Sequence, residues 1–282
     1  MRTILSCIAL LALLAGCASE SRLAEVRGFA DEAPKLAGFA DLSARFRDTY
    51  KREQPYLSAE ADAREQAIDS KRHQAYPDFV ALHEAVTAYL RGLGALAGKG
   101  RYDFSGEVRA MSAGIQAWPD TGLLDRHVDA YARLVRLMVR YGGLREQDKA
   151  LQAMLRDGYR PLQDALDAMH TLLRYFNKNH DNEQRIVMGM LAVEIPYADT
   201  PQSRLLAALA KSHQQEKAGE YRLLGLRHTL AAKNVDALRA RHAQLLRGLA
   251  PAPEDYGATP PIYAPAAQPP ASPTAALQGA RP

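Results

Sequence analysis

An aspartate and a histidine three residues apart, in Asp167-Ala168-Met169-His170, form the pattern in this sequence that comes closest to metal chemistry. Residues i and i+3 of a helix share a face, and helical bundles hold metal ions with carboxylate-x-x-His pairs from facing helices. Such a centre needs a matching pair, and the sequence has no Glu-x-x-His. The other histidines considered fall singly on different segments: His83, His127, His213, His228 and His242. We therefore expect no metal site and no cofactor.

The common catalytic motifs are missing as well. The sequence contains no G-x-S-x-G, no H-E-x-x-H and no G-x-x-x-x-G-K-[ST]. These motifs expose a nucleophilic serine, bind zinc and cradle phosphate groups, respectively. An activity would have to arise from scattered side chains, so we expect no catalytic residues and no enzymatic function.

The first 17 residues predict export. Arg2 supplies a positive charge, and Ile4 to Leu14 is an apolar run that is shorter than the roughly 20 residues of a bilayer span. A short apolar run with a charged start and small residues at its end is typical of a secretory signal. Leu14-Ala15-Gly16-Cys17 resembles the lipobox of bacterial lipoprotein precursors at all four positions.

This resemblance implies a lipid anchor. In that family the cysteine thiol receives a diacylglycerol, the preceding signal peptide is removed, and the new amino group is acylated, for example with palmitate. The mature chain would then begin at Cys17 and carry no free thiol, because Cys7 is removed. The next residue is Ala18 rather than an aspartate, so the resemblance implies the outer membrane, with the protein facing the periplasm.

Apolar residues recur at steps of three and four along most of the chain, which is the period of an amphipathic helix. Two series show it clearly: Leu124, Val128, Tyr131, Leu134, Val135, Met138 and Tyr141; and, after Pro161, Leu162, Leu166, Met169, Leu173 and Phe176. No run of four to eight residues alternates as a strand does. The sequence predicts an all-α protein, an elongated antiparallel helical bundle, with Pro161 in the first turn of a helix.

Turn-forming residues divide the expected bundle. Breaks are predicted at Ala97–Gly100 and at Trp118–Gly122, which are rich in glycine or combine proline with aspartate and glycine. The eight polar residues 177–184 predict a turn or a helix that projects past its neighbours. We expect a signal peptide at 1–16, a helical domain at 17–250 and a disordered tail at 251–282, which holds nine of the sixteen prolines.

The last helical segment is basic. Residues 200–250 contain nine lysines and arginines against three acidic residues. This excess could face anionic lipid, an acidic partner or only water. The residues considered for contact with an anionic surface are Lys211, Lys217, Arg222, Arg227, Lys233, Arg239, Arg241 and Arg247.

These features favour a non-enzymatic function. Our leading hypothesis is a lipid-anchored interaction or scaffold module of the envelope, bound to the membrane through its N-terminal lipid and to an envelope protein, and not to nucleic acid. Two alternatives remain open at this stage. The first is an immunity-type or inhibitor lipoprotein that binds a toxin or lytic enzyme, and the second is a carrier that holds an apolar ligand in the bundle core.

Overall fold

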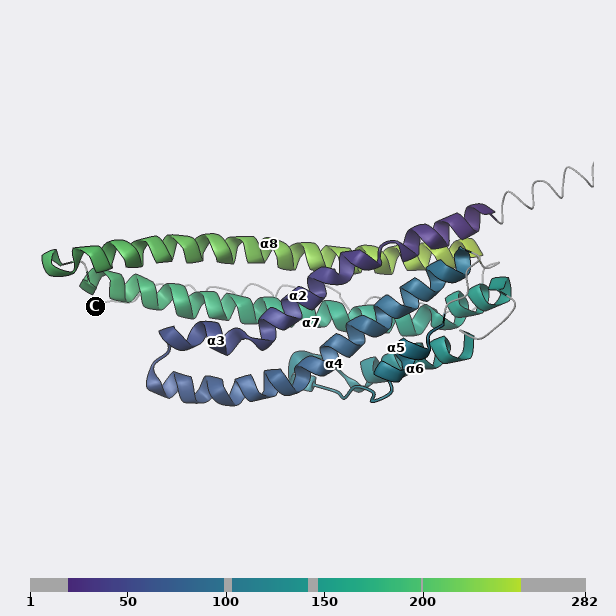
Figure 1. Cartoon of the computed structure of the whole chain (residues 1–282), viewed down its shortest axis with the longest axis horizontal. Helices are drawn as coiled ribbons and strands as arrows, with labels where there is room; N and C mark the ends of the chain where they lie inside the picture. The colour runs from purple at the N-terminus through teal and green to yellow at the C-terminus, as the bar shows by residue number, and fades with distance from the viewer. Residues whose placement is uncertain (1–19, 99–102, 142–146, 199, 250–282) are drawn as a thin grey trace, which may run out of the picture. The chain divides into compact units, whose positions relative to one another are not determined.

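The computed structural model describes residues 20–98, 103–141, 147–198 and 200–249. Every regular element within these ranges is helical, and no strand occurs in them beyond an isolated bridge between Trp118 and Leu123. The prediction of an all-α helical bundle is therefore confirmed (Figure 1). The expected signal peptide, the lipidation site Cys17 and the proline-rich tail lie outside the described residues.

Short helices precede the long ones along the chain. Residues 20–30 are helical, and the elements that follow have these bounds: η1 Ala33–Leu36, α2 Ala37–Arg47, α3 Thr49–Glu53, η2 Gln54–Tyr56, α4 Ala59–Ala97, α5 Ser105–Ala110, η3 Pro119–Thr121, α6 Asp125–Tyr141, α7 Gln147–Ala198, η4 Pro201–Ser203 and α8 Arg204–Leu249. Contacts divide the chain into one unit that ends at Leu249 and a second that starts at Ala250. None of the described helices is long and apolar enough to cross a membrane.

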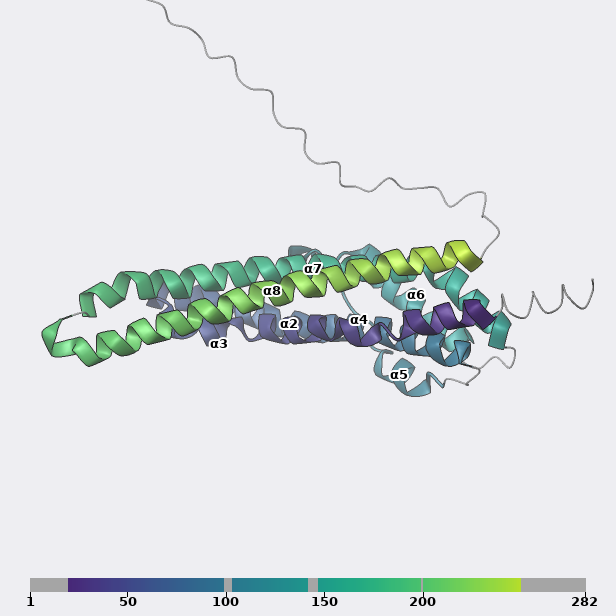
Figure 2. The same ribbon diagram turned by 90° about the horizontal axis from the view of Figure 1, so that it is seen from above.

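The two longest helices, α7 and α8, form an antiparallel hairpin. They contain 52 and 46 residues, or about 78 and 69 Å at 1.5 Å per residue. The contacts between them show this direction, because residue numbers rise along α7 while those of the contacted residues fall along α8. Gln163 donates to the carbonyl of Arg239, His170 lies 3.4 Å from Asp236, and Glu183 accepts from Tyr221. Figures 1 and 2 show the two helices side by side along their length.

Helix α4 packs along this hairpin and begins with a capped end. The hydroxyl of Ser58 accepts from the amide of Ala61, and the acidic Glu60 and Asp62 in the first turn complement the helix dipole. The helix passes through Pro77 and ends before Gly98, within the predicted break. Its second half is buried almost all round, because α2, α6 and α7 all contact it.

Two apolar clusters form the core. The larger one extends through most of the helices, and its centre is aromatic: the Phe46 and Phe176 rings stack 4.8 Å apart, with Phe79 tilted against Phe176. The smaller one, near the turn between α7 and α8, joins Val187, Leu191 and Ile195 to other residues of the hairpin. In the predicted α6 series Tyr131, Leu134 and Met138 are buried, and Val128, Val135 and Tyr141 are half-buried. Leu124 is exposed and lies before the helix begins.

Two predicted boundaries are wrong, because α7 continues through both of them. Pro161 lies inside α7 rather than in a first turn. Proline removes one backbone hydrogen bond, but Leu162 and Leu166 on the same helix are fully buried, and their burial favours a continuous helix. The polar residues 177–184 form neither a turn nor a projecting helix. They remain in mid-helix because α2 and α3 place polar side chains against them, as in the bond from Asn179 to the Thr49 hydroxyl.

Candidate functional sites

A buried ionic cluster joins α7 to the N-terminal helices. Glu183 is only 1% exposed and accepts from two arginines. Arg52 donates to both of its oxygens, at 3.0 and 2.7 Å, and Arg45 donates to Oε1 at 3.0 Å. Arg45 also reaches Glu220 on α8 at 3.0 Å. This cluster holds four helices together with satisfied charges, which is a structural rather than a reactive arrangement.

Two histidines lie beside this cluster. The His180 and His228 rings are 5.3 Å apart, and the Nδ1 atom of each is buried with no hydrogen-bond partner among the described residues. Burial, together with the neighbouring His180 and Arg45, lowers the pKa of His228 to about 4, so this ring is neutral at physiological pH. Within the described ranges no group of three potential ligands is placed to hold a metal ion. The two rings pack against each other, and His180 also packs against Tyr221.

Glu53 is a buried carboxylate without a hydrogen-bond partner among the described residues. Its side chain is 0% exposed. Burial raises its pKa to about 7, and the nearby charge of Glu65 raises it further than Arg72 lowers it. Arg72 itself is bound by Glu65 at 3.0 Å and by Asn179 at 3.2 Å. Glu53 lines none of the hollows described for this structure, and its burial without a hydrogen-bond partner bears on stability.

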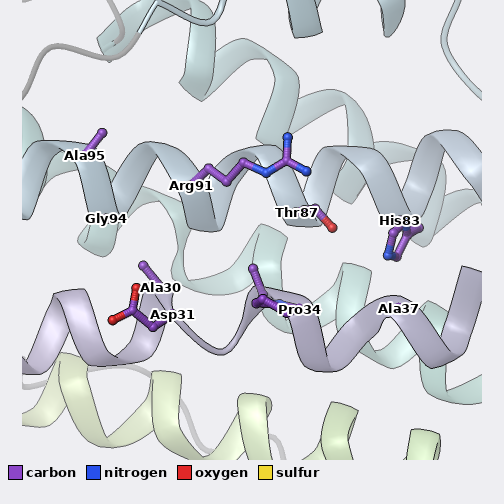
Figure 3. A pocket seen from close by; sticks show the side chains of 10 residues that line it. Ala30, Asp31, Pro34, Ala37, His83, Thr87, Arg91, Gly94 and Ala95 are labelled. Carbon is purple, nitrogen blue, oxygen red and sulfur yellow. The ribbon is translucent and has the colours of Figure 1, made fainter.

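A groove of about 680 Å³ runs between α4 and the N-terminal segment formed by residues 30–37 (Figure 3). His83, Thr87 and Arg91 of α4 line one wall, and the opposite wall is made of alanines, Pro34 and Asp31. A second hollow of about 490 Å³ shares these three residues and extends toward α5. The walls are mostly apolar, and their polar groups are concentrated on α4.

The polar groups that line this groove could bind a ligand atom that is negatively charged or accepts a hydrogen bond. Thr87 is 8% exposed, and its hydroxyl has no hydrogen-bond partner in the described structure. Arg91 is exposed and is paired with no described carboxylate. His83 stacks on Phe39 with ring centres 6.0 Å apart, and burial lowers its pKa. The groove can therefore hold a molecule with an apolar body and a negative charge placed near Arg91, away from Asp31 on the opposite wall.

Helix α8 carries an exposed row of leucines along one side, and we call this row the leucine face. Its members are 60–76% exposed: Leu205, Leu209, Leu223, Leu226 and Leu230. The side of α8 that packs against the bundle is buried through residues such as Leu224, Val235 and Leu238. In Figures 1 and 2 α8 lies at the edge of the bundle. The high exposure of these five leucines shows that no described helix covers them. The sequence analysis missed this face because α8 has leucines on both sides.

The predicted basic residues of α8 fall into two groups. Four of them form ion pairs within the chain: Lys217 with Glu220, Arg227 with Asp41, Arg239 with Asp167 and Arg241 with Glu32. Part of the basic excess thus ties α8 to the acidic residues of the preceding helices. Arg222, Lys233 and Arg247 have no ion pair with a described carboxylate, and Lys211 is exposed.

The Asp167 and His170 pair does not converge on a common point. The Asp167 carboxylate accepts from Arg126 at 2.7 Å and lies 3.4 Å from His127, and these contacts lower its pKa. His170 faces Asp236 on α8 instead. The remaining candidate histidines are distributed over the bundle: His83 in the groove, His127 beside Asp167, His213 against Tyr56, His228 beside His180 and His242 between Phe29 and Tyr159.

Comparison with known proteins finds no matching family model, no similar curated protein and no similar solved structure. A function is therefore argued from the sequence motifs and from the geometry of the described residues.

Proposed function

We propose that this chain is a non-enzymatic interaction module of the bacterial envelope, anchored to the outer membrane through lipid on Cys17 and facing the periplasm. The leucine face of α8 is its contact surface for another protein. The lipobox supports the anchor, and the exposure of five leucines on one side of one helix is the observation that supports the contact surface.

Exposed leucines need an explanation when they are grouped. Isolated apolar residues are common on protein surfaces, whereas contiguous apolar patches mark sites of interaction. Leu223, Leu226 and Leu230 follow one another at steps of three and four, so their side chains form a continuous ridge. Each exposes about 60% of its surface, and a protein partner that covers the ridge removes this apolar area from water.

Photo-crosslinking in intact cells tests the proposal. A photoreactive amino acid replaces Leu226 in the full chain, and a matched chain carries it at Ile68, an exposed apolar residue of α4. We expect discrete protein adducts from position 226 and none from position 68. Adduct patterns that do not differ between the two positions would contradict the contact surface.

Metabolic labelling with a fatty-acid analogue tests the anchor, because Cys17→Ser should abolish the label.

The groove beside α4 favours a second candidate, a carrier of an apolar molecule with an acidic head. The exposed Arg91 would bind the head, and the alanines of the opposite wall would contact the body. Native mass spectrometry of the full chain should then detect a copurified acidic amphiphile. Arg91→Gln should lose it, whereas Arg136→Gln, which changes an exposed arginine of α6, should retain it. Equal retention by both variants would exclude this candidate.

A further inference from the structure

We infer that the partner of the leucine face is a second copy of this chain, which packs its own α8 against the first in the antiparallel direction. This inference rests on the proposed function, because it takes the leucine face to be a protein contact surface. It adds the identity of the partner and the register in which the two helices meet.

The leucines are placed symmetrically along α8. The leucine face has two clusters, one that begins at Leu205 and one that begins at Leu223. These two residues are 18 positions apart, which is about five full turns at 3.6 residues per turn, so both clusters lie on the same side of the helix. Leu205 and Leu230 are equally distant from a point between Lys217 and Ala218. Leu209 and Leu226 are equally distant from the same point.

This symmetry fits an isologous pair. When two identical helices meet antiparallel about a two-fold axis, residue i of one opposes residue j of the other and the reverse holds as well. An axis at this point places Leu205 against Leu230 and Leu209 against Leu226, once at each end of the contact. Ser212 then opposes Leu223, and Glu216 opposes Gly219. A lipid surface or an unrelated helix would not require this spacing.

The middle of the face is suited to close approach. Gly219 lies on the leucine side of α8, and a Cβ atom built there would meet nothing within 4 Å. Glycine disfavours a helix interior, and no neighbour in the described structure requires it at this position. Small residues at a helix interface allow two backbones to come near each other, and Gly219 with Ser212 provides this between the two leucine clusters.

The contacts of α8 within the chain leave the leucine face uncovered. Arg227 pairs with Asp41 and Glu220 pairs with Arg45, so α2 is fixed along one flank of α8 and not over its leucines. The row from Leu205 to Leu230 covers about 38 Å of helix, a length at which leucine seams pair helices in coiled coils. A single seam of this length is small for a permanent dimer, so we expect a dissociable one.

One residue of the leucine face, Glu216, disfavours the dimer. Glu216 has a highly exposed side chain, and in this register the two copies of Glu216 lie near the two-fold axis. His213, 4.0 Å away on the same helix, offsets this repulsion only when it is protonated. The register therefore predicts that Glu216→Gln tightens the dimer severalfold, whereas Leu226→Gln weakens it at least tenfold.

Cysteine crosslinking of the full chain in its membrane tests the register. Chains with Leu205→Cys and chains with Leu230→Cys are produced together and treated with a short bismaleimide, with the parent chain setting the background from Cys7 and Cys17. We expect a strong dimer band only when both variants are present. Gly219→Cys, close to the two-fold axis, should crosslink to itself, and Ile68→Cys should not.

The outcomes separate this inference from the proposed function. Self-crosslinking of Leu205→Cys alone and of Leu230→Cys alone would indicate a parallel pair and overturn the antiparallel register. Absence of any dimer, while Leu226 still gives photo-adducts to another protein, would overturn the homotypic partner and leave the contact surface intact. Absence of both dimer and adducts, or crosslinking of the leucine face only within one chain to the segment 251–282, would overturn both.

Discussion

Arg52 and Glu183 form a two-point ion pair in the bundle interior, with Nε to Oε1 at 3.0 Å and Nη2 to Oε2 at 2.7 Å. The pair joins α3 to the middle of α7 across 131 residues of sequence. It explains why a strongly polar stretch of α7 is buried without interrupting the helix. Its removal should therefore be costly.

We expect Glu183→Gln to lower the free energy of unfolding by about 3 kcal/mol, because two arginines would lose their shared counter-charge in a poorly hydrated site. Urea unfolding of the full chain, followed by circular dichroism, measures this. Glu60→Gln is the matched control. The Glu60 and Arg64 pair is 3.8 Å apart and largely exposed, so its loss should cost less than about 0.5 kcal/mol. Equal effects of the two changes would contradict the role given to the cluster.

Glu53 should make the protein less stable as pH rises. Its folded-state pKa of about 7 lies above the ordinary glutamate pKa of 4.5, so between these values the folded state binds the proton more tightly than the unfolded state. The contribution of Glu53 to stability is then highest below about pH 4.5 and falls until about pH 7, by up to about 3 kcal/mol. Glu53→Gln should remove this slope and raise stability at neutral pH. Unfolding curves across this range, compared with those of Glu60→Gln, measure the effect, and an unchanged slope would refute it.

His242 should act in the opposite direction. Its ring stacks between Phe29 at 5.3 Å and Tyr159 at 5.5 Å, and burial lowers its pKa to about 4. The unfolded state therefore binds the proton first, and stability falls as pH decreases from about 6.5 to about 4, by up to about 3 kcal/mol. His242→Phe should reduce this loss, and His73→Gln, at an exposed histidine, should not. The same loss in both variants would show that His242 does not carry the effect.

The helical architecture was predictable because apolar residues at steps of three and four report a buried face directly. The continuity of α7 was not, since Pro161 and the polar residues 177–184 carry local signals for a break. Thr49, Arg45 and Arg52, more than 120 residues away in sequence, satisfy that polar stretch. No local pattern contains this information.

The candidate contact surface was hidden for a different reason. Leu224 is buried and Leu223 exposed, although the two are adjacent and chemically identical. The sequence shows that α8 is rich in leucine, but which side of this helix is covered depends on the positions of α7 and α2. The groove is similar, because Thr87 becomes notable only when its hydroxyl is found buried without a partner. The lipidation of Cys17 stays a prediction from the sequence.

The basic residues of α8 should differ in their effect on an anionic surface. Arg222 and Lys233 have no described ion-pair partner, whereas Arg227 and Arg239 are paired with Asp41 and Asp167. Each free cation near anionic lipid contributes about 1 kcal/mol. In a Cys17→Ser background, changing Arg222 and Lys233 to Gln should weaken binding to anionic vesicles by roughly tenfold or more. Changing the two paired arginines should have less effect.

Neutral vesicles and a salt titration complete this experiment. Binding to neutral vesicles should be weak for every variant, and the difference on anionic vesicles should shrink as salt screens the charges. If both double variants bind anionic vesicles like the parent, the cations of α8 contact only water and the chain itself.

Two helical glycines provide a matched test of the packing. A Cβ atom at Gly158 of α7 would clash with the hydroxyl oxygen of Tyr89, which donates to the carbonyl of Met154 at 2.9 Å. A Cβ atom at Gly225 of α8 would meet nothing within 4 Å. Gly158→Ala should therefore lower the free energy of unfolding by about 2–4 kcal/mol through overpacking and a strained hydrogen bond. Gly225→Ala should raise it by up to about 1 kcal/mol, because alanine favours the helix. Thermal unfolding of both variants checks the signs, and a stabilised Gly158→Ala would show that α4 and α7 are not packed as described.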